Sequence, residues 1–214
     1  SIATRLPYRQ TNAFSKTILD YLDQEEVLKP FFAHTPGVQG IQNAIRAREQ
    51  FATNREVLVQ VLEKQYAGVD TNEKVKNNIR SLLSPVTFTI TTAHQNNIFT
   101  GPLYFIYKIV HAIRLADHLQ TVLPAFHFVP VFYIGSEDAD LDELNHTWVN
   151  GNKLVWETSQ AGAVGRMKVD KALVKLIDAM EGQLSVLPFG KTVIDLLREN
   201  YTEGRTVAEA TFRL

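Results

Sequence analysis

Two polar loops hold most of the side chains in this sequence that could bind a small molecule. The first loop contains His94, Gln95, Asn96, Thr100 and Gly101. The second contains Glu137, Asp138 and Asp140. Imidazole and amide groups can hold a phosphate or a carboxylate, whereas acids can hold an amine, a ribose hydroxyl or a divalent cation. These residues are therefore the candidate substrate-binding set, and no residue type among them identifies the catalytic group.

Each polar loop directly follows an apolar run that is typical of a β-strand. The runs cover residues 86–92 and 126–134, and a long apolar-periodic segment at 103–119 lies between them. Two continuous apolar runs joined by a helix indicate parallel strands that are buried on both faces. Parallel sheets bind ligands at the carboxyl ends of their strands. We therefore expect the two loops to lie side by side and to open onto a shared cleft.

The helix at 103–119 carries two start signals, because Thr100 can serve as its N-cap and Pro102 fits its first turn. Free amides at a helix N-terminus attract a phosphate or a carboxylate. His94 and Gln95 either contact such a ligand or only satisfy backbone groups of their loop. Lys108 either reaches an anion or an acid, or extends into solvent from the edge of the helix.

The second loop holds more acids than local structure requires. Ser136 can cap a short helix that follows it, with Asp140 in the first turn. Capping explains Ser136 and one or two acids but not the whole cluster, so we favour a functional role for Glu137, Asp138 and Asp140. The histidines lack the spacing of a metal site, and no metal is predicted.

The flanking segments predict three regions of an α/β protein. Residues 1–84 are predicted to form a helical N-terminal layer that packs on the core, with a lid or specificity element as the alternative. Residues 85–147 form the first βαβ half. Residues 148–214 form a hairpin, turning at Asn150-Gly151, and a helical connecting region with a helix capped by Asp170. Because the last helix lacks a stop signal and a two-stranded sheet is small, we expect a fragment truncated before the second core half.

Composition restricts the class of protein. The 214 residues carry a net charge of -1, 45% hydrophobic residues and no cysteine. Such a chain is globular and has no basic field for nucleic acid. It has no disulfide, no thiolate metal site and no cysteine nucleophile. The sequence lacks both a signal-peptide core and an apolar run of about 20 residues that could span a bilayer. We therefore expect a cytoplasmic protein without a membrane partner.

Two segments resemble the cysteine-adding enzymes of bacillithiol synthesis, the BshC family. The segment from Thr92 to Val110 resembles the family's run Gly-Gln-Gln-x-x-x-x-Thr-Gly-Pro-Leu-Tyr. The segment from Val129 to Asn145 resembles its run Pro-Val-Phe-Trp-x-x-x-Glu-Asp-His-Asp-x-x-Glu-Ile. The order and spacing of both match, and the start from Leu6 to Ser15 is similar too. The resemblance covers nearly the whole chain.

This resemblance implies a Rossmann-like core related to class I nucleotidyltransferases and aminoacyl-tRNA synthetases. It implies a ligase that adds cysteine to the amine of glucosaminyl-malate, with ATP or ADP as the candidate cofactor. It also implies a longer protein that dimerises through a C-terminal coiled coil. The related enzymes carry a His-x-Gly-His loop, whereas His94-Gln95 is not followed by a second histidine at the matching place. A nucleotide-binding module without ligase activity and a structural protein therefore remain as alternatives.

The resemblance also assigns roles to the candidate residues. The loop with His94, Gln95, Asn96, Thr100 and Gly101 would line the pocket floor. Glu137 or Asp138 would bind the substrate amine or a sugar hydroxyl, with Asp140 in the same acidic loop. The helix amides after Gly101 would receive the malate carboxylate or a phosphate. Residues from about Trp148 onward resemble the insertion that splits the family's core and are assigned no chemistry.

Overall fold

A computed structural model describes residues 4–214 and divides the chain into two compact units. The first unit ends at Phe88, and the second comprises Thr89–Leu214. Each unit is described by itself below. Within the described part of the chain, every helix is too short or too polar to span a bilayer.

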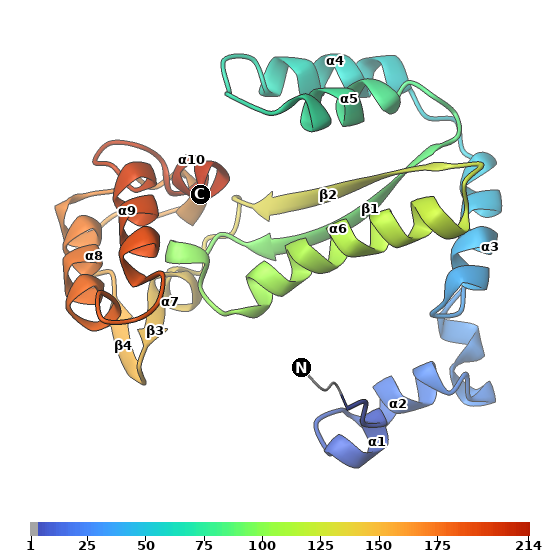
Figure 1. Cartoon of the computed structure of the whole chain (residues 1–214), viewed down its shortest axis with the longest axis horizontal. Coiled ribbons are helices and arrows are strands. Elements are labelled where there is room, and N and C mark those ends of the chain that lie inside the picture. The colour runs from blue at the N-terminus through green and yellow to red at the C-terminus, as the bar shows by residue number, and fades with distance from the viewer. Residues whose placement is uncertain (1–3) are drawn as a thin grey trace. The chain divides into compact units, whose positions relative to one another are not determined.

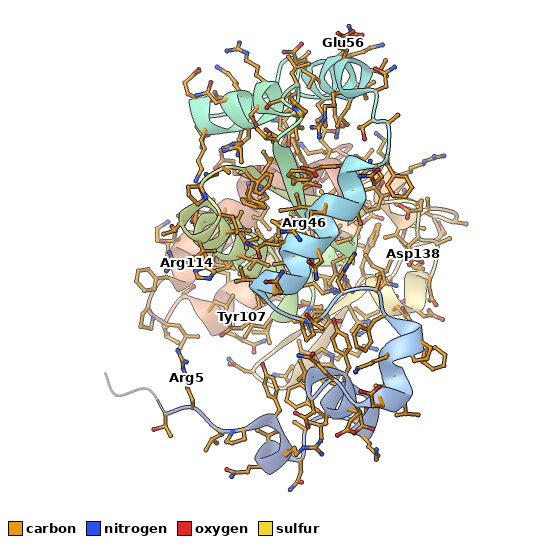
Figure 2. The ribbon with its side chains drawn as sticks, turned by 90° about the vertical axis from the view of Figure 1, so that its right-hand side faces the viewer. Arg5, Arg46, Glu56, Tyr107, Arg114 and Asp138 are labelled. Atoms are coloured by element: carbon orange, nitrogen blue, oxygen red, sulfur yellow. The ribbon has the colours of Figure 1, made fainter. Side chains whose placement is uncertain are left out.

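The first unit is helical, as its sequence predicts. Its elements are α1 (Tyr8–Thr11), α2 (Lys16–Leu22), the 3-10 helix η1 (Glu26–Phe31), α3 (Val38–Glu49), α4 (Arg55–Gln65) and α5 (Glu73–Ser81). The exposed side chains of Arg46 on α3 and Glu56 on α4 keep the charged faces of these helices in solvent (Figure 2). The Arg55 guanidinium donates to the carbonyls of Leu82 and Thr87, at 2.8 and 3.1 Å. These bonds tie α4 to the segment after α5.

Two parallel strands, β1 (Thr87–Gln95) and β2 (His127–Gly135), form the sheet, and α6 (Tyr104–Val122) connects them (Figure 1). The predicted strand–helix–strand order and the α/β class are therefore confirmed. A Cβ placed on Gly135 would lie 3.2 Å from the carbonyl oxygen of His94. The carboxyl ends of the two strands are thus immediate neighbours.

Helix α6 packs on the sheet through a narrow face. The rings of Phe105 on α6 and Phe132 on β2 meet edge to face, with centroids 4.9 Å apart. Apolar side chains of its outer face are exposed, Tyr107 among them (Figure 2); they are Leu103, Tyr104, Ile106, Tyr107, Val110 and Ile113. The small residues Ala112 and Ala116 lie on the buried face and allow close packing.

A short helix and a hairpin follow the second strand. Helix α7 covers Leu141–Leu144, and the antiparallel strands β3 (His146–Val149) and β4 (Asn152–Val155) pair with Val149 opposite Asn152. Asn150 and Gly151 both have positive φ, at 49° and 80°. A type I′ turn needs this conformation at both central positions, so the predicted hairpin and its turn are confirmed.

Helices at the end of the chain build the main hydrophobic core. They are η3 (Val164–Arg166), α8 (Lys171–Leu184), α9 (Gly190–Asn200) and α10 (Val207–Arg213), and they gather with the hairpin beyond the carboxyl ends of β1 and β2 (Figure 1). Asp170 caps α8 as predicted, accepting from the Leu173 amide at 2.9 Å. The same carboxylate accepts from the buried indole of Trp156, also at 2.9 Å. Asp170 therefore anchors the hairpin side of the core to α8.

Candidate functional site

A cavity of about 630 Å³ opens beside the carboxyl end of β1, within the unit Thr89–Leu214. Its lining comes from the loop after β1, the first turn of α6, the end of α7 and the strand β3. The lining residues are His94, Gln95, Asn97, Gly101, Pro102, Leu103, Tyr104, Glu143, His146, Thr147 and Trp148. This volume lies in the range of small-molecule sites, roughly 300–1,000 Å³. The position matches the rule that open parallel sheets bind ligands beyond their carboxyl ends.

Gln95 joins the two polar loops. Its amide nitrogen donates to Asp138 at 2.8 Å and to the carboxylate of Glu143 at 3.2 Å. Asn97, two residues on, donates from its side chain to the carbonyl of Glu143 at 3.2 Å. The predicted meeting of the two loops is therefore confirmed. The contact also places Glu143, rather than an earlier acid, against the cavity.

Backbone bonds fix the shape of the acidic loop. Asp138 accepts from the Asp140 amide at 2.9 Å, and Asp140 accepts from the Glu143 amide at 3.3 Å. Asp140 is thus the N-cap of α7, and the prediction that Ser136 caps this helix is wrong, because the turn at 138–140 delays the helix start. The Asp140 amide first, and then Gln95, lower the pKa of Asp138. Asp138 is therefore held as a carboxylate.

His94 lies under the cavity as a buried, neutral imidazole. Only 7% of the residue is exposed, and its ring stacks on Tyr104 with centroids 5.0 Å apart. Burial lowers the pKa of His94, and the nearby charge of Lys108 lowers it further. Neither ring nitrogen has a hydrogen-bond partner among the residues that the structure describes. A neutral imidazole carries one donor and one acceptor, so His94 has hydrogen-bonding capacity that the described residues do not use.

Lys108 contacts the strand end rather than an acid. Its ammonium donates to the Ala93 carbonyl at 3.1 Å and lies 5.5 Å from the centre of the Tyr104 ring. The Tyr104 ring thus lies near both the lysine and the imidazole of His94. The positive charge of Lys108 is close enough to His94 to disfavour a protonated ring. The lysine therefore helps to keep His94 neutral.

The loop between β1 and α6 has an unusual backbone. Phe99, Thr100 and Gly101 all have positive φ, at 51°, 69° and 59°. Such angles cost about 1–3 kcal/mol for each non-glycine residue and concentrate at functional sites. Thr100 cannot cap the helix from this conformation, because an N-cap residue is normally extended. The prediction of a Thr100 cap is therefore wrong, and α6 begins at Tyr104 without a side-chain cap.

Two backbone amides at the start of α6 are available to a ligand. The amides of Phe105 and Ile106 donate to the carbonyls of Pro102 and Leu103. Among the described residues, this leaves the amides of Leu103 and Tyr104 without an acceptor, and both residues line the cavity. Helix α6 has 19 residues, so its N-terminus carries the partial positive charge of a long helix dipole, roughly half an elementary charge. An anion in the cavity would find these donors beside His94.

The structure brings some of the predicted residues to the cavity and leaves others outside its lining. His94, Gln95 and Gly101 line it. Outside the lining are Asn96, Thr100, Glu137, Asp138 and Asp140. Asn96 is fully buried, and neither polar atom of its side chain has a partner among the described residues. Glu137 accepts from the Tyr133 hydroxyl at 3.1 Å. A role for Glu137 in binding the amine is therefore not favoured by its position.

Sequence reasoning missed several lining residues. Asn97 and Glu143 lie in the two polar loops, and the surplus of acids was a signal for Glu143. Trp148 begins the segment to which the sequence analysis assigns no chemistry, His146 and Thr147 directly precede it, and no local pattern marks these three residues as part of a site. Within residues 4–214, no group of three or more His, Asp or Glu side chains is placed to hold a metal ion.

Known proteins resemble this chain over nearly its whole length. The family model described as "Bacillithiol biosynthesis BshC, N-terminal Rossmann-like domain" matches residues 2–214. A protein of Cytophaga hutchinsonii named "Putative cysteine ligase BshC" is 40% identical over 207 residues, which are 97% of this chain and 38% of that protein. A protein of Flavobacterium psychrophilum with the same name is 37% identical over 209 residues, 96% of this chain and 39% of that protein.

The chain thus spans less than two fifths of the length of these relatives. The family model covers the cavity and both polar loops, and it names the Rossmann-like architecture that the parallel strands show. The chain belongs to the BshC family of bacillithiol biosynthesis and carries that family's N-terminal Rossmann-like domain.

Proposed function

We propose that this chain forms the substrate-binding part of a cysteine ligase that acts on glucosaminyl-malate in the cytoplasm. The observation that carries the proposal is the cavity, which His94 and Asn97 line beside the first turn of α6; both side chains have buried polar atoms without a hydrogen-bond partner among residues 4–214. These groups suit the malate carboxylates, because helix amides and neutral donors bind anions without burying a second charge. The names of the relatives support the ligase class.

In the proposed reaction the amine of the sugar forms an amide with the cysteine carboxyl group, which needs prior activation. ATP is the proposed source of that activation: the carboxylate oxygen would accept a phosphoryl or adenylyl group from ATP, with ADP or pyrophosphate released, and the amine would then displace phosphate or AMP and lose a proton. The same anion-binding groups could hold a nucleotide phosphate, so a nucleotide-binding module without ligase activity is the second candidate. Homodimerisation of the full-length protein stays a prediction.

The test uses the full-length protein that contains this chain. It is incubated with glucosaminyl-malate and cysteine, with and without ATP, and mass spectrometry follows the amide product. His94→Ala and Gln95→Ala are expected to reduce product formation at least tenfold, because each removes a group at the cavity. His111→Ala, at an exposed position of α6 outside the lining, is the control. Saturable ATP or ADP binding without product would favour the second candidate.

A further inference from the structure

One tryptophan of the chain is exposed at the cavity. Trp148 on β3 lines the cavity and is 61% exposed, whereas Trp156, the only other tryptophan, is fully buried. Tyr104 lines the cavity too and is 54% exposed. Large aromatic side chains contribute much binding energy when a ligand covers them, and they are enriched in recognition sites. The cavity therefore offers aromatic surface as well as polar groups.

An acid lines the cavity together with Trp148. Glu143 lies five residues before Trp148 in the chain, and Gln95 donates to one of its carboxylate oxygens at 3.2 Å. An ionised carboxylate has about four acceptor positions, so Gln95 leaves most of them unused. Asn97 holds the backbone of Glu143 through its carbonyl. The carboxylate is thus positioned by two side chains of the other loop and retains capacity for a ligand's donor.

The segments that line the cavity offer different chemistry. The β1–α6 loop and the first turn of α6 contribute the imidazole of His94 and the amides of Leu103 and Tyr104, which suit an anion. The end of α7 and β3 contribute the Glu143 carboxylate and the Trp148 indole, which suit an amine on an apolar ring face. A ligand with a carboxylate at one end and an amino sugar at the other fits both sets of groups in one orientation, with its carboxylate at the start of α6 and its sugar at Glu143 and Trp148.

We propose that Glu143 and Trp148 form the amino-sugar subsite of the cavity, with the pyranose ring stacked on Trp148 and its amine bonded to Glu143. This inference rests on the function proposed above and adds the orientation of the substrate. The C–H groups of one pyranose face are apolar and pack against an indole, while the ring hydroxyls stay at the edge. His146 and Thr147 lie beside Trp148 in the lining and provide polar groups for those hydroxyls.

The experiment measures binding to the full-length protein by calorimetry with three ligands. They are glucosaminyl-malate, its N-acetylated form, which lacks the free amine, and malate. Trp148→Ala is expected to lower the affinity for both sugar ligands by about three- to tenfold, because stacking on an indole contributes a modest part of the binding free energy. The affinity for malate should not change. Trp148→Phe should keep most of the affinity. Glu143→Gln should lower the affinity for glucosaminyl-malate but not the affinity for the other two ligands. The control is Phe31→Ala, which removes an exposed aromatic side chain of the first unit.

A second readout follows Trp148 directly. The difference in acrylamide quenching between wild type and Trp148→Phe reports the exposure of this indole, and glucosaminyl-malate should protect it. Unchanged sugar affinity in Trp148→Ala would overturn the subsite, and so would an indole already shielded in the ligand-free full-length protein. Failure of the wild type to bind glucosaminyl-malate at all would instead overturn the proposed function.

Discussion

The side-chain amide of Gln95 donates to Asp138 at 2.8 Å and so joins two residues 43 positions apart in the chain. Gln95 is the last residue of β1, and Asp138 follows the end of β2. The other oxygen of Asp138 accepts from the Asp140 amide, so both oxygens of the carboxylate are bonded. Because Gln95 reaches Glu143 as well, one amide group positions the acid that lines the cavity. Asp138 therefore acts on the site through Gln95.

Gln95→Ala is expected to raise the pKa of Asp138 toward its ordinary value. The shift should be partial, because the Asp140 amide is the larger cause of the lowered pKa and remains. A carboxyl group with a lowered folded-state pKa stabilises the protein above its unfolded-state pKa, and this contribution is lost as the pH falls through the folded-state pKa. The variant should therefore lose less stability on acidification than wild type. Carboxyl NMR titration and urea unfolding at several acidic pH values measure both effects.

Gln120→Ala is the matched control for this prediction. Gln120, near the end of α6, donates to the Phe126 carbonyl at 2.9 Å, directly before β2 begins and so at the opposite end of that strand from Asp138. Its removal should leave the Asp138 titration as in wild type. An Asp138 pKa that does not move in Gln95→Ala would contradict the assigned contact.

Gly101→Ala is expected to destabilise the β1–α6 loop. Gly101 has φ 59° and ψ −127°, and an added Cβ would lie 2.5 Å from the Cβ of Asn97. Strain of this kind costs about 1–3 kcal/mol, and the clash adds to it. Gly204→Ala separates the two causes, because Gly204 has φ 83° but no atom within 4 Å of an added Cβ. Equal losses of unfolding free energy in urea titrations of both variants would show that Asn97 does not crowd Gly101.

The sheet and the meeting of the loops could be predicted because their signals are local. Two apolar runs, each followed directly by polar residues, already determine where parallel strands end and where a ligand can approach. The hairpin turn at Asn150-Gly151 and the cap at Asp170 depend on residue types with strong conformational preferences, and both are present in the structure. Each of these features needs only a few neighbouring residues.

The lining that α7 and β3 contribute could not be predicted, because it depends on contacts between distant segments. Trp148 reaches the cavity because the core around Trp156 and α8 fixes the hairpin. Thr100 matches the sequence pattern of an N-cap, but the backbone of its loop is held in a left-handed conformation that local preference disfavours. Tertiary contacts outweigh residue preference at both places, and these are the places that form the site.

His94 should make the stability of the protein depend on pH. Burial and Lys108 lower its pKa in the folded state, whereas the unfolded chain takes up a proton near the ordinary value of about 6.5. Between those two values the unfolded state binds more protons, so the free energy of unfolding falls as the pH drops below about 6.5. His94→Gln, which stays neutral, should flatten this part of the profile in urea titrations from pH 5 to 8.

His118→Gln is the control for the pH profile, because this histidine is exposed on α6. It should keep the wild-type dependence. A profile for His94→Gln that is parallel to wild type over the whole range would show that the imidazole is not buried as described.

Tyr201→Phe is expected to loosen the cavity loop from the opposite side. The buried Tyr201 hydroxyl accepts from the Phe99 amide at 2.9 Å and is bonded to the Thr211 hydroxyl at 3.1 Å. Without it, a buried amide in the left-handed part of the loop loses its acceptor, which costs about 1–3 kcal/mol of unfolding free energy. Hydrogen exchange at the Phe99 amide should accelerate with that loss. Tyr133→Phe removes an exposed hydroxyl whose partner is Glu137, and it should leave both measurements near wild type. Tyr201 follows α9, and Thr211 lies in α10. If exchange at the Phe99 amide stayed as slow in Tyr201→Phe as in wild type, the terminal helices would not support the cavity loop through this hydroxyl.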